Sequence, residues 1–230
     1  MATFMLIHGG GHRGWHWNLL RPELERLGHE TLAPDVPMED PSVGTAVWAD
    51  VVLAALGDRP LQDVVLVGHS YAGLGLPVIA ARGPFRRMVF VCANVPVPGR
   101  KYGEYLAENE DAVIMPPIEI DELGRIVVPW EVARDVYYGD VDEALAREAW
   151  EHIGPNATTG FDEVCPIDEW PDVPASYVLC QDDRIIGPSW SRRVSLERLG
   201  GPAIELPGSH SPMLSRPADL ARVLDDLARL

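Results

Sequence analysis

The stretch DVVLVGHSYAG, residues 63–73, decides the fold of this chain. An apolar run of strand length leads directly to His69 and Ser70, and a helical pattern begins there. A tight turn from strand to helix holds a serine side chain clear of the sheet, and small neighbouring residues let the backbone turn without clashes. The stretch is similar to the pattern G-x-S-x-G, with Ala72 in the last place and Gly73 after it. It therefore predicts that Ser70 is a nucleophile.

Apolar runs of strand length recur on both sides of this stretch and alternate with helical patterns. We expect strands at residues 3–7, 30–34, 63–67, 88–92, 176–180 and 203–206. We expect helices at residues 15–27 and 45–56, and from Ser215 as N-cap to residue 230. Continuously apolar strands that alternate with helices are typical of a parallel sheet covered on both faces. The predicted fold class is therefore α/β, with a doubly wound, mostly parallel sheet.

One long segment breaks this alternation, since residues 96–174 show helical patterns and no clear strand. Insertions of this length in compact domains are usually functional, so we interpret the segment as a helical lid over an active site. An ordinary set of packing helices is the alternative. The prediction is a single domain with a core of residues 1–95 and 175–230 and a lid of residues 96–174. Three aromatic residues of the lid are candidates for the substrate pocket: Trp130, Tyr137 and Trp150.

Composition limits the partners that we expect. The chain has 230 residues, 47% of them hydrophobic, and a net charge of -16, which argues against a broad basic surface for nucleic acid or for an anionic membrane. The first residues resemble a buried strand, and no apolar run approaches the ~20 residues that span a bilayer. The three cysteines lack CxxC spacing, which favours reduced thiols and a cytoplasmic protein. Composition leaves open whether the protein forms a homodimer.

A serine hydroxyl needs a base to take its proton. His210 lies in PGSHSP, residues 207–212, between the last expected strand and the last helix. Among the histidines, only His210 is expected on a loop at the carboxyl edge of the sheet, so we predict that it is the base. The side chain of His69 should point away from Ser70, because neighbouring residues in a tight turn diverge. Two further histidines lie in polar stretches where we expect exposure: His29 and His152.

A carboxylate must then orient the imidazole. The strand at 176–180 ends in QDDRII, so Asp182 and Asp183 both lie at the required edge. The acid is expected to be followed by one residue, then by two apolar residues, with a proline nearby. Asp183 fits this pattern through Ile185, Ile186 and Pro188 and is therefore favoured, with Asp182 as the alternative. The order of serine, aspartate and histidine along the chain is the one expected for this type of fold.

Two backbone N–H groups must stabilise the oxyanion that forms during acyl transfer. One is expected from Tyr71, directly after the nucleophile. The other is expected from Gly10 in HGGGH, residues 8–12, where three glycines let the backbone approach the substrate. We interpret the nearby histidines as parts of this loop and expect no metal: His8, His12 and His16.

The same glycines also fit a dinucleotide-binding spacing. Gly9, Gly11 and Gly14 match the bare pattern G-x-G-x-x-G, and Asp35 lies near the distance expected for a ribose-binding acid. The histidine before the glycines and the other triad candidates favour the hydrolase interpretation.

With these residues identified, the chain resembles the group of α/β-hydrolases that contains plant methylesterases and hydroxynitrile lyases, and in particular its small bacterial members. Four motifs carry the resemblance: LIHG (6–9) with Trp15 and Trp17, GHS (68–70), CQDD (180–183) and GSHSPML (208–214). In the lyases a threonine follows the first-strand histidine and a lysine follows the catalytic histidine. Here these positions are Gly9 and Ser211, which is the esterase pattern.

These observations predict a serine hydrolase that cleaves a small or medium apolar carboxylic ester through an acyl-enzyme. Ser70 attacks the acyl carbon, His210 transfers the proton, Asp183 orients His210, and no cofactor is needed. A lactonase or C–C bond hydrolase of secondary metabolism is the alternative enzyme, and a slow-turnover ligand sensor is the alternative of another class. Cyanohydrin cleavage is not expected.

Overall fold

A parallel sheet forms the centre of the molecule in a computed structural model that describes residues 1–114 and 116–230. Its strand order is β2-β1-β3-β4-β7-β8, and each neighbouring pair is parallel. The strands are β1 (Thr3–Ile7), β2 (Glu30–Leu32), β3 (Val64–His69), β4 (Arg87–Val91), β7 (Ala175–Cys180) and β8 (Ile204–Leu206). The predicted doubly wound parallel sheet is confirmed.

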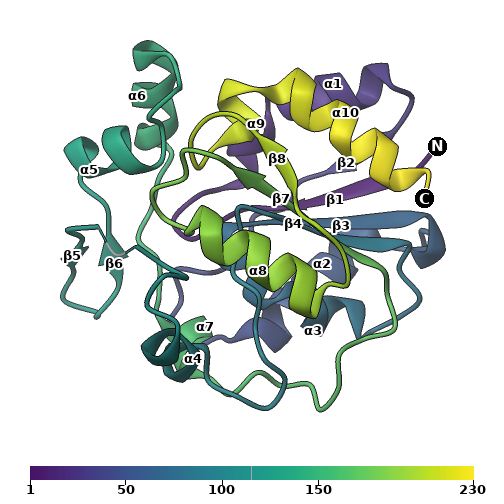
Figure 1. Cartoon of the computed structure of the whole chain (residues 1–230), viewed down its shortest axis with the longest axis horizontal. Helices are drawn as coiled ribbons and strands as arrows, with labels where there is room; N and C mark the ends of the chain where they lie inside the picture. Colours follow the sequence, from purple (N-terminus) through teal and green to yellow (C-terminus); the bar gives the residue numbers. More distant parts are fainter. Residues whose placement is uncertain (115) are drawn as a thin grey trace.

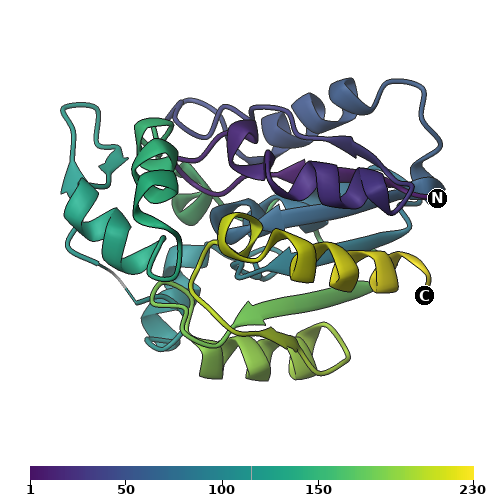
Figure 2. The ribbon, with the colours of Figure 1, turned by 90° about the horizontal axis from the view of Figure 1, so that it is seen from above.

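Helices cover both faces of this sheet (Figures 1 and 2). One face packs against α1 (Leu20–Arg26) and α10 (Pro217–Ala228), with Phe4 and Leu6 of β1 in that layer. The other face packs against α2 (Thr45–Leu56), α3 (Leu76–Ala80) and α8 (Pro188–Arg198). Because successive strand residues point to opposite faces, a strand between two helical layers must be apolar throughout. This is why residues 4–7 of β1 and residues 64–67 of β3 are all apolar.

Two helical predictions need correction. The helix expected at residues 15–27 is divided into a 3-10 turn, η1 (Gly14–Trp17), and α1. The last helix does not begin with Ser215 as its N-cap: the short α9 (Pro212–Ser215) ends there, and Arg216 is the N-cap of α10. Pro217 explains the break, because a proline disfavours helical backbone in the residue before it, and Arg216 has φ -140 and ψ 48.

Residues 96–174 lie between β4 and β7 and contain α4 (Tyr102–Glu108), α5 (Trp130–Val136), α6 (Glu143–Glu151) and α7 (Thr159–Asp162). They also contain a short antiparallel pair of strands, β5 (Glu119–Ile120) and β6 (Ile126–Val127). The expectation of no strand in this segment is wrong, because strands of two residues leave no apolar run in the sequence. Figure 1 shows α5, α6 and this pair at the end of the molecule away from both termini. The helical lid remains our interpretation of this segment.

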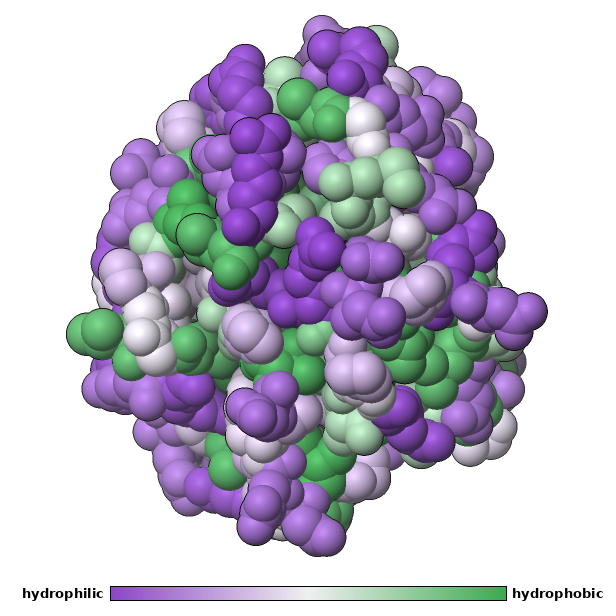
Figure 3. All heavy atoms as spheres, turned by 90° about the vertical axis from the view of Figure 1, so that its right-hand side faces the viewer, coloured by the Kyte–Doolittle hydropathy of each residue, from purple (hydrophilic) through white to green (hydrophobic). Residues whose placement is uncertain are grey.

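The side of the molecule that carries the two termini is mainly hydrophilic, with smaller hydrophobic areas between the polar side chains (Figure 3). In the part of the chain that the structure describes, no helix has the length and apolar character needed to cross a membrane. Cys92, Cys165 and Cys180 are buried and free. The cytoplasmic location and the absence of nucleic-acid and membrane partners stay predictions.

Candidate active site

Ser70 lies where β3 passes into the 3-10 turn η3 (Ser70–Leu74). Its φ of 53° lies in the left-handed region, which is unusual for a residue with a side chain and marks a sharp turn. A Cβ on Gly73 would lie 2.0 Å from the backbone oxygen of Asn94, so only glycine fits there. Ala72, in the usual last place of the pattern, is fully buried. The small residue that this turn requires is therefore Gly73, one place beyond the usual pattern.

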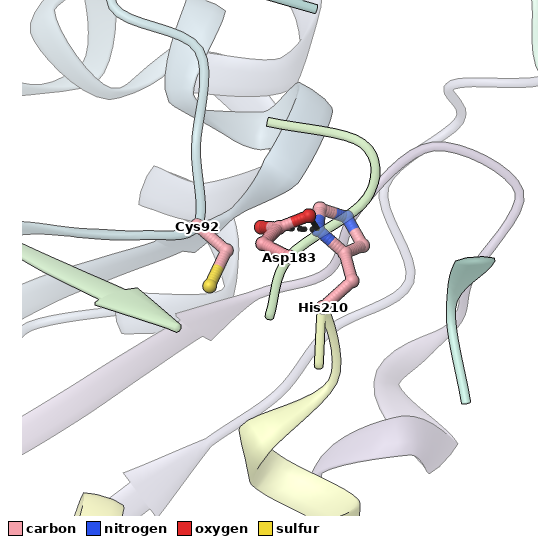
Figure 4. A group of neighbouring side chains, drawn as sticks. All are labelled: Cys92, Asp183 and His210. Carbon is pink, nitrogen blue, oxygen red and sulfur yellow. Dashed lines mark hydrogen bonds and ion pairs between the residues drawn. The ribbon is translucent and has the colours of Figure 1, made fainter. Parts of the chain in front are cut away.

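His210 and Asp183 form a buried pair at the carboxyl edge of the sheet (Figure 4). Nδ1 of His210 lies 2.9 and 3.0 Å from the two carboxylate oxygens of Asp183. The backbone N–H groups of Ile185 and Ile186 also donate to this carboxylate, at 2.8 and 3.0 Å. Because Nδ1 donates to Asp183, Nε2 is the acceptor of the neutral ring. The adjacent Asp182 is exposed, and its backbone N–H donates to Gly208 O at 3.0 Å.

Two further side chains hold His210. Nε2 of His69 donates to the backbone carbonyl of His210 at 2.9 Å, so the His69 side chain lies against the backbone of His210. The ring of Tyr137 stacks on the imidazole with a centroid distance of 5.6 Å. In the described part of the chain, Nε2 of His210 is buried without a hydrogen-bond partner, and it makes no hydrogen bond to Ser70 Oγ. Catalytic hydrogen bonds are often long before substrate binds.

Cys92 lies on the other side of Asp183 from His210 (Figure 4). One potential metal-ligand atom from each of the three residues lies within 4.8 Å of the other two, a spacing that a metal ion could bridge. Burial raises the pKa of the Cys92 thiol well above its usual value, and a protonated thiol is a poor ligand. The Asp183 oxygens are already engaged by three donors. We therefore interpret the group as a histidine–aspartate pair packed against a thiol.

The glycine loop after β1 is held by the histidines around it. Nδ1 of His8 donates to Gly9 O at 2.9 Å, and Nδ1 of His12 donates to Gly10 O at 3.0 Å. A trans peptide directs its N–H opposite to its carbonyl, so the bond to Gly9 O turns the N–H of Gly10 away from His8. Gly10 and Tyr71, the two expected oxyanion donors, both line the cavity that contains Ser70.

These loop histidines are neutral at pH 7. Burial lowers the pKa of His8, lowers that of His12 well below its usual value and lowers that of His16 to about 3. His29, which we expected to be exposed, is also largely buried, and its Nε2 lies 2.9 Å from Asp225 Oδ1. Its polar sequence neighbours gave no sign of this pairing, which spans 196 residues of chain. His152 is exposed, as expected.

The dinucleotide alternative does not fit the loop. Gly14 opens a 3-10 turn of four residues, where a dinucleotide site needs a helix whose first turn faces the pyrophosphate. Asp35 accepts the backbone N–H of Gly14 at 2.7 Å, so its carboxylate secures the loop.

A cavity of about 630 Å³, part of it open to solvent, adjoins Ser70. Tyr137 lines it, as expected, but Trp130 and Trp150 are not among the described residues around it. Instead, the guanidinium of Arg147 stacks on Trp130 at 3.7 Å, and Trp150 Nε1 donates to Val128 O at 3.0 Å. The two tryptophans pack against each other, with ring centroids 6.0 Å apart. The cavity has other walls that we did not predict: Asn94, Val113, Asn156, Phe161, Ile185 and Ile186.

Comparison with known proteins places this arrangement in one family. The sequence profile of the alpha/beta hydrolase family matches residues 4–223. The chain therefore belongs to the alpha/beta hydrolase family.

Its relatives include ester-cleaving enzymes. A pyrethroid hydrolase of Sphingobium wenxiniae is 27% identical over 248 residues, which cover 99% of this chain and 88% of the relative. Methylesterase 2 of Arabidopsis thaliana is 24% identical over 241 residues, which cover 93% and 91%. The crystal structure of polyneuridine aldehyde esterase has the same fold, with a TM-score of 0.81, 19% identity and 99% coverage of each chain. The resemblance to the methylesterase group is confirmed.

Proposed function

We propose that this protein is a serine esterase that cleaves neutral, apolar carboxylic esters, with Ser70, His210 and Asp183 as its catalytic triad. The buried pair of His210 and Asp183 carries the proposal, because it leaves imidazole Nε2 without a partner among the described residues. This Nε2 belongs to a ring stacked on Tyr137, which lines the same cavity as Ser70. The names of the pyrethroid hydrolase and methylesterase relatives support ester cleavage.

The steps follow from the chemistry of these groups. His210 Nε2 accepts the proton of Ser70 as Oγ bonds to the acyl carbon, and Asp183 stabilises the imidazolium that forms. The N–H groups of Gly10 and Tyr71 stabilise the oxyanion. His210 then protonates the departing alkoxide, and the ester bond breaks to leave an acyl-serine. Water, deprotonated by His210, then attacks the acyl carbon; the bond to Ser70 Oγ breaks, His210 returns the proton to Oγ, and the acid is released.

The cavity wall supports a neutral, apolar substrate. Its described lining contains no Asp, Glu, Lys, Arg or His side chain. Val113, Ile126, Phe161 and Ile186 instead present apolar surface. A charged substrate group would lose its hydration here without gaining an ion pair, and that loss is costly.

The test is hydrolysis of a p-nitrophenyl ester series by the wild type and by Ser70→Ala. We expect Ser70→Ala to lower turnover by about 10⁶-fold and to abolish labelling by a fluorophosphonate, because no nucleophile remains. Circular dichroism should show an unchanged fold. Substantial residual turnover, or labelling at another residue, would contradict the assignment of Ser70.

A further inference from the structure

Asn156 lies in the insertion, at the edge of the cavity. Its backbone pairs with Ile126 of β6 through two hydrogen bonds of 2.7 and 2.9 Å, so its position is well defined. Its side chain lines the cavity and is only 6% exposed. Among the described residues that line the cavity, no charged side chain accompanies it.

The orientation of the Asn156 amide is set by its neighbours. Nδ2 donates to the backbone carbonyl of Ala157 at 2.9 Å, and the hydroxyl of Tyr71 donates to the same carbonyl at 2.9 Å. The reversed amide would place Oδ1 against that carbonyl, oxygen against oxygen. Oδ1 is therefore the amide atom without a hydrogen-bond partner, since no donor of the described chain reaches it. A buried acceptor without a donor is uncommon and costs free energy.

The amide also lies against the oxyanion loop. A Cβ on Gly10 would lie 2.8 Å from Cγ and 2.9 Å from Oδ1 of Asn156, so glycine is needed for this contact. Gly10 is the proposed donor to the substrate carbonyl oxygen. A substrate held there has its acyl carbon and the adjoining carbon close to the Asn156 amide.

We propose that Asn156 Oδ1 accepts a hydrogen bond from a neutral donor on the acyl part of the substrate, close to the reacting carbonyl. The preferred substrates are then esters of hydroxy acids, or of acids with an N–H group in the equivalent place. An ammonium group is not suited, because no carboxylate lines the described wall. This inference rests on the proposed esterase function and specifies its substrate class. Because Oδ1 is buried in the structure, the proposal requires a small rotation of the Asn156 side chain when the substrate binds.

The experiment compares kcat/KM of the wild type for three esters of one shape. Methyl mandelate carries a 2-hydroxyl group, its methyl ether (methyl 2-methoxy-2-phenylacetate) carries an oxygen in the same place without a hydrogen to donate, and methyl phenylacetate carries neither. We expect methyl mandelate to exceed both others by roughly tenfold, the effect of one net hydrogen bond. A ratio near one would overturn the proposal, as would equal preference for the methoxy ester.

Variants identify the residue responsible. Asn156→Leu should reduce the ratio of methyl mandelate to methyl phenylacetate to near one, and Asn156→Ala should do the same if the leucine variant does not fold. Asn109→Leu is the matched control. Asn109 also lies in the insertion and also donates through Nδ2 to a backbone carbonyl, that of Tyr105 at 3.0 Å, but it is not among the described cavity residues. Its ratio should equal that of the wild type.

The outcomes separate this inference from the esterase proposal. Ser70-dependent turnover of p-nitrophenyl acetate together with a ratio that Asn156→Leu or Asn156→Ala leaves unchanged would overturn only the role of Asn156. Absence of Ser70-dependent turnover on every ester would overturn the esterase proposal and this inference with it. A preference for methyl mandelate that is lost only in the Asn156 variants would support both.

Discussion

Asp182 and Asp183 are neighbours with the same side chain, and their surroundings separate them. The Asp183 carboxylate is buried and accepts hydrogen bonds from His210 and from two backbone N–H groups. The Asp182 side chain is exposed to solvent. Of the two, only the Asp183 carboxylate contacts the imidazole of His210, so only it can orient this ring and stabilise an imidazolium there.

We expect Asp183→Asn to lower kcat by about 10⁴-fold, because an amide in this place favours the wrong imidazole tautomer. Asp182→Asn should cost far less, since its carboxylate does not contact His210. Both variants can be measured with the ester that the wild type hydrolyses fastest. If Asp182→Asn were the more damaging change, the assignment of Asp183 would have to be abandoned.

At the scale of elements, the insertion is joined to the catalytic loops at both ends of the site. The Tyr71 hydroxyl in η3 donates to Ala157 O at 2.9 Å and accepts the N–H of Gly160 at 2.7 Å. On the other side, Ser209, directly before His210, donates its hydroxyl to Asp140. The same insertion that walls the cavity therefore also holds the loops that carry Ser70 and His210.

Removing one of these attachments should loosen the insertion. We expect Tyr71→Phe to lower the free energy of unfolding by about 1–3 kcal/mol, because the N–H of Gly160 is left buried without an acceptor. Hydrogen exchange of the Gly160 amide should accelerate.

Tyr102→Phe is the matched control for this change. Tyr102 is also buried in the insertion, but its hydroxyl has no partner among the described residues, so its loss should be neutral or stabilising. Urea unfolding and exchange monitored by mass spectrometry give both quantities. Equal effects of the two substitutions would show that the Tyr71 hydroxyl does not anchor the insertion.

At the scale of the whole molecule, four buried histidines make folding sensitive to acid. Burial is the main cause that lowers the pKa of His8, His12, His16 and His69. In the unfolded chain a histidine has a pKa of about 6.5, so below this pH the unfolded state binds more protons than the folded state. The stability is therefore fully present above that pH and is lost as the pH falls toward the folded-state values.

Each of these histidines should contribute up to about 1.4 kcal/mol per pH unit below pH 6.5. We expect the urea midpoint of the wild type to fall between pH 7.5 and pH 5.5, before most carboxylates titrate. The slope of the free energy of unfolding against pH gives the number of protons taken up on unfolding. His16→Gln should lower this number by about one, and His152→Gln, at an exposed histidine, is the control for the substitution itself. A midpoint independent of pH over this range would refute the expectation.

Local sequence patterns were sufficient for the sheet and for the candidate triad. The runs at β1, β3, β4 and β7 are apolar on both faces, and strands of that kind belong inside a parallel sheet. Ser70, Asp183 and His210 each follow a strand, and parallel strands place such residues at one edge. Each of these inferences depends on a few neighbouring residues, so it could be made before the structure was known.

The cavity walls depended on contacts that neighbouring residues do not encode. Trp130 and Trp150 were chosen as large aromatics of the insertion, but they pack on each other and on Arg147, outside the described cavity lining. Asn156 had no sequence signal, because its place beside Gly10, 146 positions earlier in the chain, results from pairing with Ile126. The sequence by itself determined the strands of the parallel sheet and which loops carry the candidate triad, since these follow from local hydrophobic patterns. Only the tertiary structure decided which side chains face the substrate, because that depends on how the insertion packs against loops distant in the chain.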